Sequence, residues 1–363
     1  MKIDFANLAY QHTLYKEEIE QAVLNVMHQC NFIMGEDVFQ LENALEKFTG
    51  AKHAITCSSG TDALTLAMMA LGIKPGDEII TTPFTFIATA ETIVRLGAIP
   101  VFVDIDETTY TIDPLKIESK ITPNTKAILP VSLYGQPSDL DEIQIIADKY
   151  NLKVIIDGAQ SFGSTYKTKT DSALGDISCT SFFPAKPLGC YGDGGALFTD
   201  DDAIADKIKS LRLHGQTKRY HHQYIGIGGR LDTIQAAVLN VKLKYYPQDL
   251  ALRQNVAVKY TRLLADSGYI LPFIKSDRSS TWAQYSIRVD NREALQTRLK
   301  DAHIPTAVHY PRPLHLQECF SRLGYRENNC PIAEQVSREI LSLSMNPYIT
   351  DEEIHYIAAS LCG

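Results

Sequence analysis

The sequence predicts an α/β protein in which a mostly parallel sheet lies between helices, followed by a smaller α+β domain. Over the first two-thirds of the 363 residues, short apolar runs alternate with longer amphipathic stretches. This is the pattern of a sheet whose strands are joined by helices. After Pro247 the alternation gives way to mixed periodicity. We therefore expect a large domain at residues 1–247 and a small one at 248–363, with about the first 12 residues as candidates for packing on the small domain.

Each strand of the large domain is predicted from a short apolar run. In chain order these runs are His53–Cys57, Glu78–Thr81, Pro100–Asp104, Ala127–Val131, Lys153–Asp157, Ser181–Phe183 and Ala196–Thr199. Helices are predicted where apolar residues recur every three to four positions. These segments are Gly60–Leu71, Ile87–Leu96, Leu140–Tyr150 and Thr233–Tyr245. In the small domain, Trp282–Val289 alternates like an antiparallel strand and Val336–Leu343 has helical spacing.

Charge and hydropathy argue against several classes of protein. A net charge of −8 without a basic run is atypical of general nucleic-acid binders. The sequence has no apolar run near the roughly 18 residues that span a membrane, and its first residues do not resemble a signal peptide. The seven cysteines are scattered without metal-binding spacing. We therefore expect a cytoplasmic protein with reduced thiols.

Lys186 lies between the apolar run at Ser181–Phe183 and the glycine-rich segment Gly192–Gly195. A desolvated lysine has a lowered pKa and can hold a carbonyl cofactor as a Schiff base. Asp157 ends another apolar run, at the position where open α/β sheets bind ligands. A lysine and a carboxylate in these places predict a pyridoxal phosphate site, because the carboxylate keeps the pyridine nitrogen protonated.

Other residues are candidates for the rest of the cofactor. Gln160 follows Asp157 by three residues and could bind the ring hydroxyl. Gly60 and Thr61 open a predicted helix whose N-terminus could bind the phosphate, with Ser181 adding a hydroxyl; an ordinary helix cap is the alternative reading. Phe84 and Phe86 are candidates for stacking on the ring, and at least one of them is expected in the core.

Five motifs in one order carry a resemblance to a known family. They are Ser-Gly-Thr-Asp-Ala-Leu from Ser59, Pro-Phe-Thr-Phe-Ile-Ala-Thr-Ala-Glu from Pro83, Val-Asp-Ile-Asp from Val103, Asp-Gly-Ala-Gln from Asp157 and Ser-Phe-Phe-Pro-Ala-Lys from Ser181. The chain thus resembles, nearly end to end, the DegT/DnrJ/EryC1/StrS sugar-nucleotide aminotransferases. The resemblance implies the aspartate aminotransferase fold (fold type I of pyridoxal phosphate enzymes) and homodimers with shared active sites.

The resemblance also implies roles for single residues. Lys186 would hold the cofactor and carry protons, Asp157 would pair with the pyridine nitrogen and Gln160 would contact the ring hydroxyl. The phosphate would be bound by Thr61 and Ser181, and Phe86 would stack on the ring. Residues from about Tyr220 to Arg230 would complete the partner's site. The family is associated with the assembly of cell-surface polysaccharides.

Two positions depart from the family pattern. Relatives usually have an asparagine two residues before the arginine that matches Arg230, where it reaches the partner's cofactor phosphate. This chain has Gly228 there. Glycine has no side chain to reach the phosphate, so the resemblance does not predict this contact for the present chain. An acidic residue often precedes the aspartate, and this chain has Ile156.

The likeness extends to enzymes that aminate carbon 3 of a UDP-linked 3-keto-N-acetylglucosaminuronate, with L-glutamate as the expected donor. Arg230 is the candidate partner for the uronate carboxylate, and His309 and Tyr310 are candidates for the sugar or nucleotide region. A dTDP-3-keto-6-deoxyhexose is the alternative substrate, since relatives that act on such sugars also have this arginine.

The resemblance also admits other functions. Lys186 argues against the family's dehydratase branch, which has histidine at this position. A non-enzymatic cofactor-binding regulator and a different pyridoxal phosphate reaction, elimination or sulfur transfer, are the remaining alternatives. We expect no metal site, because His221 and His222 are adjacent and would point to opposite faces of a strand.

Overall fold

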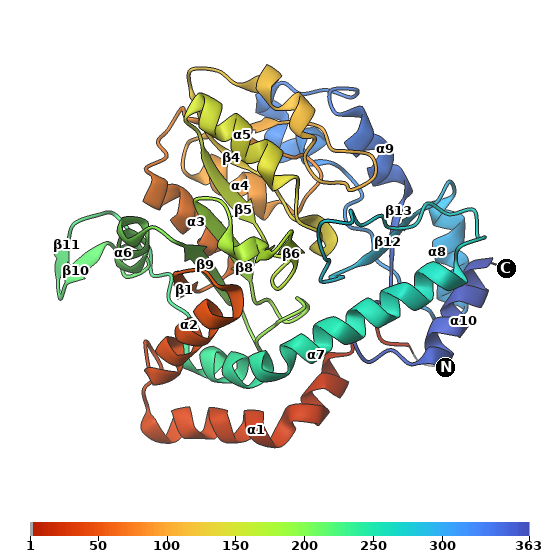
Figure 1. Cartoon of the computed structure of the whole chain (residues 1–363), viewed down its shortest axis with the longest axis horizontal. Helices are drawn as coiled ribbons and strands as arrows, with labels where there is room; N and C mark the ends of the chain where they lie inside the picture. The colour runs from red at the N-terminus through yellow and green to blue at the C-terminus, as the bar shows by residue number, and fades with distance from the viewer. Residues whose placement is uncertain (1–2, 363) are drawn as a thin grey trace.

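The computed structural model describes residues 3–362, and its centre is a seven-stranded sheet in the order β1-β9-β8-β5-β4-β2-β3 (Figure 1). The strands are β1 His53–Cys57, β2 Glu78–Thr81, β3 Ile99–Phe102, β4 Thr125–Leu129, β5 Lys153–Asp157, β8 Ile177–Ser181 and β9 Gly195–Thr199. Neighbouring strands are parallel except at β9, which is antiparallel to both β1 and β8. The predicted α/β class with a mostly parallel, mixed sheet is therefore confirmed.

Helices cover both faces of this sheet (Figure 1). On β5, Ile155 packs in the cluster with helices α3, α4 and α6, whereas Ile156 packs with α5, because successive strand side chains point to opposite faces. The helices of this region are α2 Glu36–Thr49, α3 Gly60–Leu71, α4 Ala88–Arg95, α5 Leu140–Tyr150 and α6 Asp202–Leu211. Helix α1 (Leu8–Gln29) lies along the first half of the long helix α7 (Thr233–Leu263).

A second core lies in the C-terminal part of the chain. It joins the end of α7 to strands β12 (Tyr285–Arg288) and β13 (Ile340–Leu343), which form an antiparallel pair. The helices α8 Arg292–Asp301 and α10 Asp351–Cys362 pack in this second core, whereas α9 Pro331–Glu339 packs Ala333 and Val336 in the main core. Ile3 is buried in this second core, and the division of the chain at residue 247 stays a prediction.

Of the predicted elements, three differ most from the structure. Helix α7 continues through Pro247, since buried residues on both sides of the proline pack on the two cores and offset the lost hydrogen bond. The helix expected at Val336–Leu343 is wrong after Glu339, because Ile340–Leu343 pairs with β12 as a strand. A short apolar run does not distinguish a buried strand from a buried helix. Strand β8 ends at Ser181, before Phe182 and Phe183.

Short elements complete the described chain. They are the strands β6 Thr165–Tyr166, β7 Lys169–Thr170, β10 Gln216–Lys218 and β11 His221–His222, and the 3-10 turns Pro114–Lys116, Glu118–Lys120, Leu133–Gly135, Asp171–Ala173, Leu314–Leu316 and Glu318–Leu323. The β10–β11 hairpin stands out from the body next to α6 (Figure 1). Within residues 3–362, we find no helix with the length and apolarity needed to cross a membrane.

Candidate active site

The ends of neighbouring strands bring three predicted site residues to one edge of the sheet. Asp157 ends β5 and Ser181 ends the adjacent parallel strand β8. Strand β1 leads to α3 at the same edge, and Gly60 approaches so closely that a Cβ there would lie 2.6 Å from the Ser181 Cβ. A larger residue than glycine would push these two segments apart. The carboxyl edge of a parallel sheet is the usual position of ligand sites in this class.

The N-terminus of α3 forms a cradle suited to a phosphate. Ser59 caps the helix, and its hydroxyl accepts a hydrogen bond from the Asp62 N–H at 3.0 Å. The Asp62 carboxylate accepts from the Ser58 hydroxyl. Thr61 lies half-buried in the first turn. The free N–H groups and the positive end of the helix dipole favour an anion here. The structure brings Gly60, Thr61 and Ser181 together at this N-terminus, and their role in binding a phosphate stays a prediction.

Asp157 is buried, with 5% of its surface exposed. Its carboxylate accepts from the Thr89 hydroxyl at 2.8 Å and from the Ala159 N–H at 3.2 Å. Burial raises the pKa of the Asp157 carboxyl, and the Thr89 and Ala159 hydrogen bonds and the Lys186 charge act in the opposite direction. A buried carboxylate of this kind is stabilised by any cation or ring N–H brought beside it.

Lys186 lies in the turn between β8 and β9. Its backbone N–H donates a hydrogen bond to the Phe183 carbonyl at 2.8 Å. Burial lowers the pKa of the Lys186 ammonium, and the nearby Asp157 charge partly restores it. The amine is therefore easier to deprotonate than that of a surface lysine, as required of a nucleophile that forms a Schiff base.

The C-terminal region reaches this site through His309 and Tyr310. The Gln160 amide donates to the Tyr310 hydroxyl at 3.3 Å and accepts from the Tyr134 N–H at 2.7 Å. Burial, helped by the Lys186 charge, lowers the pKa of His309 to about 4, so its imidazole is neutral at pH 7. The Ser342 hydroxyl lies 2.9 Å from the His309 Nδ1 and fixes the ring.

The two candidate phenylalanines have different surroundings. Phe84 is completely buried in the main core, whereas Phe86 is 55% exposed. The Phe86 ring lies 6.1 Å from the Tyr310 ring. Phe86 therefore keeps a free apolar surface beside Tyr310 and is suited to stacking on a flat ligand.

Arg230 borders a hollow of about 500 Å³ whose lining includes Ser58, Ser59 and Asp62. The Arg230 Nε is buried, with no hydrogen-bond partner among the described residues. At Gly228, which replaces the usual asparagine, a Cβ would lie 3.1 Å from the His214 imidazole. The His214 ring thus occupies space next to the missing side chain.

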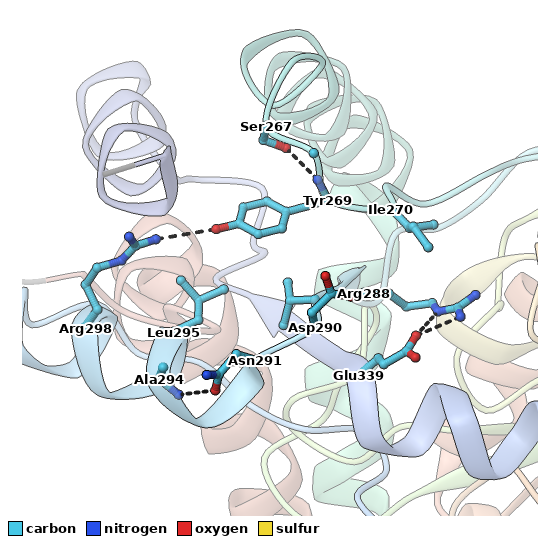
Figure 2. A pocket seen from close by; sticks show the side chains of 12 residues that line it. Ser267, Tyr269, Ile270, Arg288, Asp290, Asn291, Ala294, Leu295, Arg298 and Glu339 are labelled. Carbon is cyan, nitrogen blue, oxygen red and sulfur yellow. Dashed lines mark hydrogen bonds and ion pairs between the residues drawn. The ribbon is translucent and has the colours of Figure 1, made fainter.

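Another cavity, of about 540 Å³, lies in the C-terminal region (Figure 2). Its lining residues include none of the predicted site residues. Arg288 is paired there with Glu339 at 2.7 Å, and Arg298 donates to the Tyr269 hydroxyl at 3.4 Å. Its two arginines are thus already bonded within the protein, and we do not assign this cavity to the cofactor.

The model of the DegT/DnrJ/EryC1/StrS aminotransferase family matches residues 13–362. The chain belongs to this family. It is 48% identical to a Pseudomonas aeruginosa UDP-2-acetamido-2-deoxy-3-oxo-D-glucuronate aminotransferase, with 99% of each chain covered. It is 40% identical to an Aneurinibacillus thermoaerophilus dTDP-3-amino-3,6-dideoxy-alpha-D-galactopyranose transaminase, covering 99% of this chain and 98% of that one. The crystal structure of S. venezuelae DesV, in complex with a ketimine intermediate, superposes with a TM-score of 0.98 at 34% identity, covering 99% of this chain and 98% of that one.

The protein is therefore an aminotransferase that depends on pyridoxal phosphate, and the predicted cofactor is confirmed at this level. The edge of the sheet fits that group. The α3 N-terminus, kept open by Gly60, matches the phosphate, and the buried Asp157 carboxylate matches a protonated ring nitrogen. Lys186 and the exposed Phe86 ring supply the amine and the stacking surface.

Two groups that the sequence analysis missed hold the predicted residues of this aminotransferase. The Tyr134 N–H fixes the Gln160 amide, and the Thr89 hydroxyl fixes Asp157. The sequence carried no signal that singled out Thr89 among the neighbouring threonines; in the structure its hydroxyl also lies 3.0 Å from the Thr85 hydroxyl. His221 and His222 are both exposed, and residues 3–362 contain no group of three or more metal-ligating side chains.

Replacing Thr89 by valine is expected to lower kcat about tenfold. Valine keeps the shape but removes the hydrogen bond to the Asp157 carboxylate, and a bond to a charged group contributes about 1.5–3 kcal/mol. Steady-state kinetics at saturating substrates would measure the loss. Thr85→Val is the matched control, because its hydroxyl reaches Thr89 and not Asp157; equal losses in both variants would contradict the role of the Thr89–Asp157 bond.

Proposed function

We propose that the protein transfers an amino group from L-glutamate to a nucleotide-linked 3-ketosugar, forming UDP-2-acetamido-3-amino-2,3-dideoxy-glucuronate. The observation that supports this choice of sugar is Arg230, which borders a polar hollow and has a buried Nε without a hydrogen-bond partner among residues 3–362. A guanidinium is the natural bidentate partner of a uronate carboxylate. The full-length likeness to the Pseudomonas aeruginosa enzyme supports the same choice.

Each residue of the site has its own role in the proposed reaction. The cofactor, when bound, supplies an electron sink and carries the amino group between the two substrates. Lys186, with its pKa lowered by burial, takes a proton from the α-carbon of glutamate and later returns one to carbon 3 of the sugar. Asp157, held by Thr89, keeps a negative charge beside the ring nitrogen. The neutral His309 and Tyr310 line the sugar side.

We also propose that two copies share their active sites and that the enzyme works in the cytoplasm, in the assembly of cell-surface polysaccharide. Tyr220 is 77% exposed and Ile225 is 91% exposed on and beside the protruding β10–β11 hairpin. Such apolar side chains are suited to cover a partner subunit. The seven cysteines are all free, which is typical of proteins in a reducing compartment.

The substrate is tested with the protein converted to its pyridoxamine phosphate form. The UDP-linked 3-keto uronate and a dTDP-linked 3-keto-6-deoxyhexose are added separately, and the return of the lysine-bound cofactor absorbance is followed. We expect recovery with the uronate. Recovery with the deoxysugar alone would favour the second candidate, which the likeness to the Aneurinibacillus enzyme supports. Recovery with neither would contradict the proposed substrate class.

Replacing Arg230 by glutamine is expected to raise the KM for the uronate substrate about 10- to 100-fold, because a charge-assisted hydrogen bond to a carboxylate contributes about 1.5–3 kcal/mol. The half-reaction with glutamate should change far less. Arg262→Gln, at an exposed position on α7, is the control and should behave as the wild type. An unchanged KM in the Arg230 variant would remove the carboxylate role from this residue.

A further inference from the structure

Lys242 on α7 is a lysine with a nearly completely buried side chain, 3% exposed. Its Nζ donates a hydrogen bond to the Gly189 carbonyl at 2.7 Å and lies 4.7 Å from the centre of the Tyr191 ring. Neither of these two groups carries a full negative charge. Lys242 makes no ion pair among the described residues, and an unpaired buried ammonium is costly. Burial lowers the pKa of Lys242 to about 8, with the charges of Cys190 and Asp249 acting in the opposite direction. Hydrophobic packing would be served equally well by an apolar side chain.

Both contacts of Lys242 are in the turn that presents Lys186. This turn is closed by the Lys186 N–H bond to Phe183 and by the Cys190 N–H bond to Phe182, both 2.8 Å. Gly189 packs so tightly that a Cβ there would lie 2.5 Å from the Pro184 carbonyl oxygen. A shift of Gly189 is therefore passed directly to Pro184, two residues before Lys186.

Further hydrogen bonds hold the end of the turn against the helices α7 and α1. The Tyr191 N–H donates to the Gln235 side chain of α7 at 2.8 Å. The Tyr191 hydroxyl lies 2.9 Å from the His12 Nδ1 of α1. Lys242 thus reaches from α7 to the turn, and the Tyr191 ring beside its charge is held by His12 of α1.

We infer that Lys242 is a positioning residue for the active-site lysine: its ammonium, held between the Gly189 carbonyl and the Tyr191 ring, fixes the turn that places Lys186 against the cofactor. This inference rests on the proposed role of Lys186. Lysine is required because it alone of the residues of this length offers both a hydrogen-bond donor for Gly189 and a compact cation for the aromatic face.

Lys242→Met tests the inference, since methionine fills a similar volume without a donor or a charge. We expect a folded variant that binds pyridoxal phosphate, with kcat reduced about 10- to 100-fold, the cost of a small misplacement of a reacting group, and with little change in KM. The apparent pKa of the lysine-bound cofactor, read from its absorbance against pH, should also shift. Lys244→Met is the matched control: this lysine lies on the same helix, exposed and paired with Glu18 at 3.1 Å.

A second variant guards against a folding defect. Tyr191→Leu removes the aromatic face and should reduce kcat and shift the absorbance titration in the same direction, whereas Tyr191→Phe keeps the ring and should stay close to the wild type. A wild-type kcat and titration in Lys242→Met would overturn the inference. So would a loss of activity that only follows a loss of thermal stability. Lys186→Ala, measured in parallel, separates the two proposals: if it keeps the lysine-bound absorbance, the assignment of Lys186 itself fails.

Discussion

Lys186→Ala is expected to bind pyridoxal phosphate and to lose at least about a thousandfold in kcat. The side chain supplies both the amine that holds the cofactor and the base that moves the substrate proton, and loss of a group with two such roles removes most of the chemistry. Its pKa is lowered by burial, so removing the ammonium takes a poorly solvated charge out of the site. We therefore expect no loss of thermal stability in the cofactor-free protein.

Glutamate-dependent amination, measured beside cofactor binding, checks this prediction. Lys244→Ala, at an exposed position on α7, is the control and should keep full activity. A fully active Lys186→Ala would contradict the site. A variant that no longer binds pyridoxal phosphate at all would show that the α3 cradle and Phe86 contribute less to binding than their arrangement indicates.

Asp157→Asn is expected to lower kcat about 100- to 1,000-fold, the usual cost of removing one electrostatic group that stabilises developing charge. Asparagine keeps the shape of the side chain and can keep the bonds to Thr89 and Ala159. It cannot supply the negative charge that favours a protonated pyridine nitrogen. The loss should therefore be in catalysis rather than in folding.

Stability measurements separate these two effects. Burial raises the pKa of Asp157 in the folded protein, so the folded state binds the proton more tightly than the unfolded state. The contribution of this carboxyl to stability is then present below its unfolded pKa and is lost as the pH rises through the folded pKa. At pH 7 the cofactor-free Asp157→Asn protein should melt at the same temperature as the wild type or higher. A lower melting temperature with unchanged kcat would contradict the assignment.

Most large-domain strands were predictable because they are short apolar runs whose two faces are both covered. The exception is β8 (Ile177–Ser181), which ends where the predicted run Ser181–Phe183 begins. Five elements, β1, β2, β5, α3 and α5, have the predicted bounds. Ile340–Leu343 was misread because burial against β12, a contact distant in sequence, decides its conformation. The extension of α7 through Pro247 has the same origin, since tertiary packing there overrides the local preference of proline.

The site was predictable where function needs a particular residue type at a strand end or helix start, as at Lys186, Asp157 and Gly60. The supporting groups were not, because they act through geometry. Thr89 is one threonine among several in its segment until the fold places it 2.8 Å from Asp157. From the sequence alone, a lysine such as Lys242 on a helix is expected to be exposed to solvent. The packing of α7 against the turn shows that it is buried.

The assignment of Lys186 is tested most directly by trapping the cofactor on the lysine that holds it. The protein is loaded with pyridoxal phosphate, reduced with borohydride and digested, and the modified peptide is identified by mass spectrometry. We expect the label on Lys186. A label on Lys242, the buried lysine of α7 that contacts this turn, or on no lysine at all, would contradict this assignment.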